Sequence, residues 1–255
     1  MNIQTVTFNK ISFVNVTDPK ALEIKYLKNN FGFSSLHLDD YLNKTQVPKI
    51  ETTPTYTLVV LDFPYFYQNG QTPAQNSTSI LGFINVPSVP LPQVPFPTFT
   101  ADKKRRITSS QVDFFIGRDF LVVLHDGMLT SINDIFSFCQ KTLRKRTELM
   151  EKGPGFLFYR LVDGLVDNCF PVINEISSSI DKIDRGLETT QSGKILEEIS
   201  TTRRNIVVFH TMIKPLLPLF KQLEEGKFKS LNDNLIPFWE NISDHLQKIW
   251  DRLED

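Results

Sequence analysis

The chain has 255 residues, 40% of them hydrophobic and 22% charged, so it is long enough to bury a core and has the balance of an ordinary folded protein. Its net charge of −1 provides no concentrated basic surface, and we expect no nucleic-acid partner. The short basic clusters at 103–106 and 141–146 are typical of solvated faces, with a phosphate or lipid contact as the alternative.

The cysteines bear on the redox compartment of the chain, and the prolines bear on whether it can cross a membrane. Cys139 and Cys169 have no CxxC spacing, so we expect neither a disulfide framework nor a structural zinc site, and a reducing compartment fits better. Residues 63–101 contain no Asp, Glu, Lys or Arg, but seven prolines interrupt them and exclude a continuous spanning helix. We therefore expect an extended loop there and no membrane span in these 255 residues. No signal peptide is expected either, because the N-terminal stretch MNIQTVTFNKISFVNV lacks a charged start followed by an apolar run.

The first half of the chain predicts short strands with two intervening helices. Asp18 and Pro19 predict the start of a helix that ends at Gly32, and a second helix is expected over 35–43. The tight connection 117–119 predicts an antiparallel pair of strands on either side of it. Stretches rich in β-branched and aromatic residues predict strands at 5–8, 11–16, 48–52, 56–63, 111–116 and 120–125.

From Thr130 onward the sequence predicts helices. Ser131 or Asn133 is expected to cap a helix that runs to about Lys152. A stripe of apolar residues at steps of three and four follows from Leu157 to Leu187, with a local bend expected at Pro171. A hairpin tip is expected at 191–193, and the chain then returns as a second long helix antiparallel to the first.

The last helix is expected to begin near Leu231. Its apolar residues have heptad spacing, which is typical of a helix that supercoils or packs against identical neighbours: Leu235, Trp239, Ile242, Leu246, Ile249 and Leu253. No Gly or Pro follows, and the acidic end opposes the helix dipole, so we expect this helix to continue in a longer protein.

These patterns together predict an α+β fold. We expect an α/β domain over residues 1–129, with a small mixed or antiparallel sheet flanked by helices and a proline-rich insertion at about 63–106. Long antiparallel helices are expected over 130–255, ending in a stalk helix over 231–255.

Signals of enzyme chemistry are sparse, and we expect no catalytic activity. The sequence has no glycine-rich phosphate loop, no GxSxG and no HExxH, and its four histidines lie on four different elements. Cys169 could pair with a histidine as a nucleophile, but its place on an apolar stripe favours a buried structural cysteine.

Two groups of oxygen ligands are candidates for a metal site. Asp163 and Asp167 are four residues apart and so share one face of a helix, where they can hold a hydrated divalent ion or pair with Lys and Arg of a neighbour. The last helix offers Glu240, Asn241, Asp244 and His245 on the side away from its seam, where a solvated face is the alternative.

The segment FLFYRLVDGLVDNCFPVINEISSSIDKID, which follows Gly155, resembles the signature helix of the CorA family of divalent-cation channels. Three more stretches are similar to that family in the same order: YLKNNFGFSSLHLDDYLNKTQVPKIE, VDFFIGRDFLVVLH and PFWENISDHLQKIWDRLED. The resemblance covers nearly the whole chain apart from the residues between Phe63 and Arg106.

The resemblance implies an N-terminal cytosolic domain, cut before two membrane helices and a Gly-Met-Asn pore motif. It implies a homopentamer in the cell membrane, with this part on the cytoplasmic face. It also implies that Mg²⁺ is both the transported and the regulatory ion, with Co²⁺, Ni²⁺ and Zn²⁺ as alternatives. Magnesium between adjacent subunits would hold such a channel shut, because an ion shared across an interface stabilises the conformation that joins both halves.

The candidate sensor departs from the family pattern at two places. Asn241 stands where resembling members have an acid, and the stretch after the strand ending near Phe63 offers no partner carboxylate. The metal ligands implied for this chain are therefore Asp163, Asp167, Asn241, Asp244 and His245, with a weakened site expected. A zinc-transporting relative and a non-transport coiled-coil scaffold remain the alternative functions.

Overall fold

A computed structural model describes residues 2–43, 47–67, 106–186, 192–228, 231 and 234–255. Its strands are β1 (Ile3–Phe8), β2 (Ile11–Thr17), β3 (Lys49–Thr52), β4 (Thr57–Phe66), β5 (Ile107–Ile116) and β6 (Phe120–His125). Its helices are α1 (Ala21–Phe31), α2 (Ser35–Asn43), α3 (Thr130–Lys141), α4 (Leu143–Met150), α5 (Pro154–Asp167), α6 (Cys169–Gly186), α7 (Ser192–Ile213), α8 (Leu216–Glu224) and α9 (Ile236–Glu254).

The strands form one mixed sheet in the order β1-β2-β6-β5-β4-β3. The β2–β6 pair is parallel, whereas the other pairs are antiparallel, including the predicted pair β5–β6 across the tight turn at Gly117. The predicted α+β fold with a mixed sheet is therefore confirmed.

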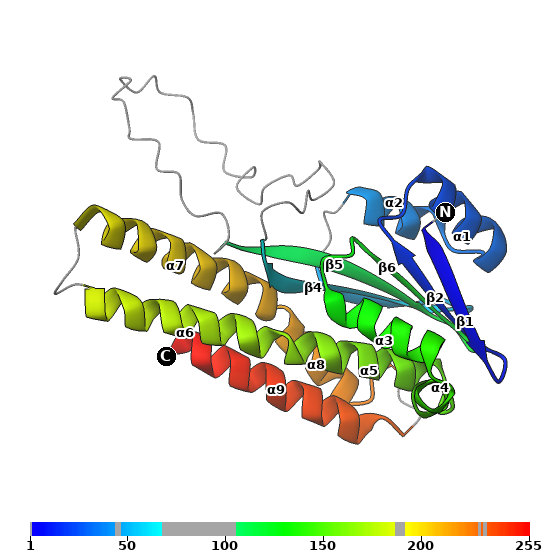
Figure 1. Cartoon of the computed structure of the whole chain (residues 1–255). Coiled ribbons are helices and arrows are strands. Elements are labelled where there is room, and N and C mark those ends of the chain that lie inside the picture. Colours follow the sequence, from blue (N-terminus) through cyan, green and yellow to red (C-terminus); the bar gives the residue numbers. More distant parts are fainter. Residues whose placement is uncertain (1, 44–46, 68–105, 187–191, 229–230, 232–233) are drawn as a thin grey trace.

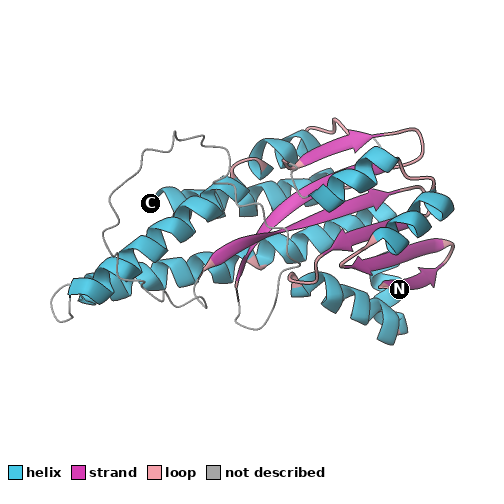
Figure 2. Ribbon diagram, turned by 90° about the horizontal axis from the view of Figure 1, so that it is seen from above, coloured by secondary structure: helices cyan, strands magenta, loops and turns pink. Residues whose placement is uncertain are grey.

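Alternation along the strands gives the sheet two apolar faces, each covered by helices (Figures 1 and 2). One face, with Leu58, Val60 and Phe115, packs against α1 and α2. The other, with Phe63 and Phe114, shares a larger core with the helices from α3 to α9. The sheet is thus the middle layer of an α/β/α arrangement, and α6 and α7 extend beyond it as an antiparallel pair.

Two helix starts differ from those that the sequence indicates, α1 beginning later and α3 earlier. Asp18 is not the cap of α1, because its backbone is left-handed (φ 48°) and Lys20 takes the N-cap position. The Glu23 carboxylate accepts hydrogen bonds from the backbone N–H groups of Lys20 and Asn2, which ties the helix start to β1. In α3 the expected caps Ser131 and Asn133 lie inside a helix that begins at Thr130.

The helix predicted to run to Lys152 is divided at Thr142. Thr142 has extended backbone (φ −126°, ψ 112°) and separates α3 from α4. The Arg146 guanidinium donates hydrogen bonds to the carbonyl oxygens of Cys139 (2.6 Å) and Gln140 (2.8 Å). These bonds satisfy carbonyls that the end of α3 leaves without a helical partner, which makes the break stable.

The long apolar stripe is also interrupted, at Asn168 between α5 and α6. The bend expected from Pro171 is present here as a break, because proline has no N–H to donate to the Asp167 carbonyl four residues earlier. Ser192 and Gly193, expected at a hairpin tip, are instead the first residues of α7. Gln191 and Leu187 lie outside the described residues.

The proline-rich insertion begins later than expected, whereas β5 begins at Ile107, where the expected insertion ends. Phe63 to Phe66 belong to β4 and pair with β5 as far as Ile107. Pro64 is accepted there because β3 pairs with β4 only as far as Val60, so Pro64 lies on an edge. The rest of the insertion, 68–105, lies outside the described residues.

The last helix begins at Ile236 rather than near Leu231. Pro237 explains the difference, since proline fits the first helical turn but would clash inside a helix that started five residues earlier. The heptad seam packs inside its own chain, not against a copy of it, because α9 contacts α5, α6, α7 and α8. Its residues Trp239, Ile242, Leu246 and Ile249 are fully buried.

One helical stretch of the described chain, Gly193–Glu224, is long and apolar enough to cross a membrane, a test that core helices of soluble proteins also pass. The turn at Lys214 and Pro215 divides it into α7 and α8. Its apolar residues Phe209, Ile213 and Phe220 are buried against the rest of the chain. In this fold the stretch therefore serves as part of the core.

A tryptophan on α9 tests the internal seam. Trp239 packs against Phe158, Tyr159 and Phe220, and its indole N–H donates to the Leu231 carbonyl. We expect Trp239→Ala to lower the free energy of unfolding by about 3–5 kcal/mol in urea titrations. Ile236→Ala, at an exposed position of the same helix, should change it by less than about 0.5 kcal/mol. Equal effects of the two substitutions would contradict an internal seam.

A buried carboxyl in the sheet predicts a pH dependence of stability. Asp113 on β5 is fully buried; its Oδ1 accepts from Gln111 (2.7 Å), and its Oδ2 has no hydrogen-bond partner among the described residues. Burial raises the pKa of Asp113 to about 7, with the Gln111 bond and Lys49 opposing and Asp40 and Asp62 reinforcing the rise. The folded chain thus keeps a proton between about pH 4 and 7 that the unfolded chain loses.

The burial cost of this carboxylate is absent below about pH 4 and complete above about pH 7. Asp113→Asn should therefore raise the free energy of unfolding by on the order of 2–4 kcal/mol at pH 8, with the gain shrinking toward pH 4. Thermal unfolding of both proteins across this range measures it. A gain that does not change with pH would contradict the account.

Candidate metal centre

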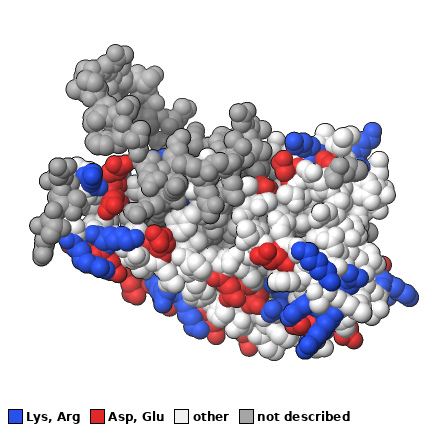
Figure 3. Space-filling view, in the orientation of Figure 1, with Lys and Arg blue, Asp and Glu red and all other residues white. Residues whose placement is uncertain are grey.

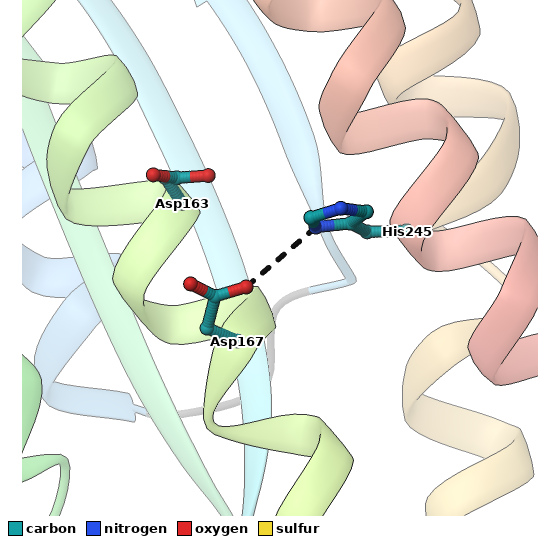
Figure 4. A group of neighbouring side chains, drawn as sticks. All are labelled: Asp163, Asp167 and His245. Atoms are coloured by element: carbon teal, nitrogen blue, oxygen red, sulfur yellow. Dashed lines mark ion pairs between the residues drawn. The ribbon is translucent and has the colours of Figure 1, made fainter.

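Two neighbouring helices carry the candidate ligands (Figure 4). Asp163 and Asp167 lie one turn apart at the C-terminal end of α5, whose opposite face is buried through Leu157, Leu161 and Leu165. His245 lies on α9, next to the seam residue Leu246. The packing of α9 against α5 therefore brings the imidazole to the two carboxylates.

The three side chains converge closely enough to share an ion. One ligand atom from each of Asp163, Asp167 and His245 lies within 4.8 Å of the others. His245 Nδ1 lies 3.6 Å from Asp167 Oδ1, too far for a normal hydrogen bond. That nitrogen is buried and has no hydrogen-bond partner among the described residues. The His245 ring is steadied by an edge-on contact with Phe170.

The local electrostatics favour a cation. The C-terminal end of a helix carries partial negative charge, and two carboxylates add to it at this place. Burial raises the pKa of Asp163, and the Asp167 charge raises it further, while Arg160 and His245 act in the opposite direction. The Arg160 guanidinium donates to Asp163 Oδ2 at 2.8 Å and neutralises part of this charge.

The structure brings together three of the five predicted ligands. Asn241 and Asp244 are both exposed on α9. Asp244 is not part of the convergent group, because adjacent residues of a helix are turned by about 100° from each other and Asp244 directly precedes His245. Asp167 is more than half exposed, whereas the Asp163 side chain is only 14% exposed. Pro64 to Tyr67, at the end of β4, include no acid.

Two residues at the site were not among the predicted ligands. Arg160 is three residues before Asp163, a spacing at which opposite charges on a helix pair. The sequence spacing could therefore have predicted this ion pair. The contact of Phe170 with His245 depends on the break between α5 and α6, and no spacing indicated it.

The alternative of a nucleophilic cysteine is not supported. Cys169 is 1% exposed, and its thiol lies against the Leu165 carbonyl. Burial raises its pKa well above the ordinary value, so the thiol stays protonated. Cys139 is also buried, as expected for structural cysteines.

Charges of both signs alternate over the described residues of the face in Figure 3. Such mixing is typical of a solvated surface. The described residues of this face therefore give no evidence of a binding surface of a single charge sign.

A family model and individual relatives both relate this chain to CorA proteins. Residues 94–255 match the family model "CorA-like Mg2+ transporter protein". The cobalt/magnesium transport protein CorA of Thermotoga maritima is 22% identical over 246 residues, which cover 95% of this chain and 59% of that protein. The chain thus spans less than two thirds of this relative's length.

Solved structures share the fold. The soluble domain of CorA from Methanocaldococcus jannaschii superimposes with a TM-score of 0.72 at 14% identity, over 98% of this chain and 85% of that one. The cytoplasmic domain of ZntB from Vibrio parahaemolyticus superimposes with a TM-score of 0.64 at 10% identity, over 97% and 82% of the two chains. At these identities the likeness concerns the fold alone.

Proposed function

Because the chain belongs to the CorA-like Mg²⁺ transporter family, we propose that it is the cytosolic regulatory domain of a divalent-cation transporter. The matching residues 94–255 include both α5 and α9, the two helices that carry the candidate metal centre. In this proposal Mg²⁺ is the transported ion, with Co²⁺ as a second cargo as in the name of the Thermotoga relative. The protein would lie in the cell membrane, with this domain on the cytoplasmic face.

The convergence of Asp163, Asp167 and His245 is the observation that supports regulation. These residues fit a divalent cation, since two carboxylates repel each other and a buried nitrogen lacks a partner. An ion bound here contacts α5 and α9 together, so it stabilises the arrangement in which the two helices are close. Its contribution grows as RT ln(1 + [ion]/Kd), which makes the fold responsive to cytosolic ion concentration.

The outer surface of α9 supplies a second part of the proposal. Asn241 and Asp244 are exposed and can face an adjacent subunit in a homopentamer. Asn241 offers a carbonyl oxygen but no charge, so an ion shared between subunits at this place would be held more weakly than by two carboxylates. Regulation in this chain would then depend more on the centre between α5 and α9.

Magnesium should stabilise the purified chain. At about ten times its Kd, Mg²⁺ adds about 1.4 kcal/mol, which corresponds to a rise of roughly 3–5 °C in Tm for a chain of this size. We expect this rise at millimolar Mg²⁺, its reversal by EDTA, and its loss in the double variant Asp163→Asn, Asp167→Asn. Asp181→Asn removes one exposed carboxylate from α6 and should keep the rise. No change in Tm at millimolar Mg²⁺ would rule out a magnesium sensor.

The gene beyond codon 255 tests the transport part of the proposal. We expect it to encode two apolar segments of about 20 residues with Gly-Met-Asn between them. Sequencing of the transcript reads this directly. A stop codon at this place would favour a scaffold protein over a transporter.

A further inference from the structure

A cavity of about 360 Å³ lies at one end of the sheet, next to the start of α9. Three connections of the chain form its other walls: the turn between β3 and β4, the turn between β5 and β6, and the residues that lead from α4 into α5. Sites that hold small organic molecules usually have volumes of about 300–1,000 Å³. The side chains of the candidate metal centre do not line this cavity.

We propose that the cavity binds a small organic anion of the phosphate-ester class, in which the phosphate is attached to an apolar ring. The phosphate would lie on the cationic side of the cavity and the ring against its apolar walls. This site is separate from the metal centre and does not depend on the proposed function.

The charges of the lining favour an anion. Arg118 in the β5–β6 turn and Lys152 before α5 bring two cations from separate parts of the chain. No Asp or Glu is among the described residues that line the cavity, although Asp119 and Glu151 are their neighbours in the sequence. The ion pairs of the described chain involve neither cation. Both charges are therefore available to a bound phosphate.

The cationic side of the cavity is open to a ligand. The Lys152 ammonium group lies 4.6 Å from the centre of the Phe156 ring, a contact that holds the charge at this wall. Gly153 has a left-handed backbone (φ 101°), and a Cβ atom there would meet no other atom within 4 Å. Space beside the ammonium group is thus left free by a residue without a side chain.

The remaining walls are apolar and decide which anion fits. Ile116, Phe156 and Leu235 line the cavity, and each side chain is otherwise buried in the fold. Inorganic phosphate would contact only the cationic side. A phosphate ester with a ring also covers these carbon atoms and removes apolar surface from water, which favours it over the free ion.

A ligand in this cavity would contact the sheet, the first turn of α5 and the start of α9 together. It would therefore stabilise the packing of both helices on the sheet, and the melting temperature should rise with ligand concentration. Such a rise is a second measurement beside the binding constant.

Calorimetric titration of the chain without divalent cations tests the proposal, with phenyl phosphate, inorganic phosphate and phenol as the probes. We expect phenyl phosphate to bind with a Kd in the low millimolar range or tighter. Inorganic phosphate should bind about tenfold more weakly, because it buries no ring. Phenol should show no binding at the same concentrations, because it has no charge for the two cations.

Four substitutions locate the binding. Arg118→Gln and Lys152→Gln should each weaken phenyl phosphate about tenfold, because each removes a charged donor. Thr55→Glu keeps both cations but places a carboxylate at an exposed position of the lining, and it should abolish binding. Lys25→Gln is the matched control, since it removes an exposed cation on α1, away from the cavity, and should leave binding unchanged.

Far-ultraviolet circular dichroism should show that each variant is folded. No binding of phenyl phosphate at millimolar concentration would overturn the proposal. Unchanged binding in both folded cavity variants, Arg118→Gln and Lys152→Gln, or an equal loss in Lys25→Gln, would indicate diffuse attraction to surface charge and would overturn it as well. Equal affinity for phenyl phosphate and inorganic phosphate would contradict the assignment of the apolar walls.

Discussion

The burial of the α9 seam inside its own chain is the constraint on which the rest of the structure depends. Trp239, Ile242, Leu246 and Ile249 fill the space among α5, α6, α7 and α8, where aromatic rings from α5 and α8 surround the indole. This burial fixes the rotation and height of α9 relative to α5. His245 is therefore held opposite Asp163 and Asp167, although more than seventy residues separate the two helices along the chain.

A second constraint acts on the other side of the centre. Pro171 ends α5 at Asp167, so Asp167 is the last residue of the helix and Asp163 lies one turn before it, close to the end where the helix dipole adds negative potential. An uninterrupted helix through Asn168 would have placed Asp167 in the middle of a helix and removed this contribution. The break also places Phe170 against the His245 ring. Local backbone chemistry and long-range packing thus act on the same three side chains.

Much of the fold could be predicted from the sequence, since strands with alternating apolar residues and helices with steps of three and four reveal their own periods. The exact positions of the two helix breaks were harder to predict. The break at Thr142 depends on Arg146 bonding to the end of α3, and the break at Asn168 depends on Pro171, three residues further along. The role of the heptad seam was misjudged. Its spacing shows that one face of α9 is buried, but not whether the burying surface belongs to the same chain or to a copy.

The candidate site was predicted only in part, because local spacing can be read from the sequence and the packing of one helix on another cannot. The spacing of Asp163 and Asp167 puts them on one face whatever the tertiary structure is. Asp244 and His245 are adjacent in the sequence, yet only His245 joins the group with Asp163 and Asp167. Such a separation follows from the rotation of α9, which only the packed structure determines. The buried Asp113 left no trace in the sequence, because the position of a polar residue in a strand does not reveal which neighbours cover it.

The most direct measurement of the central claim is anomalous diffraction from crystals of the chain soaked in Ni²⁺. The account predicts a peak between α5 and α9, within about 2–2.3 Å of His245 Nδ1 and of one oxygen each of Asp163 and Asp167. A peak bound only by exposed residues such as Asp244, or no peak at all, would contradict the claim that an ion joins these two helices.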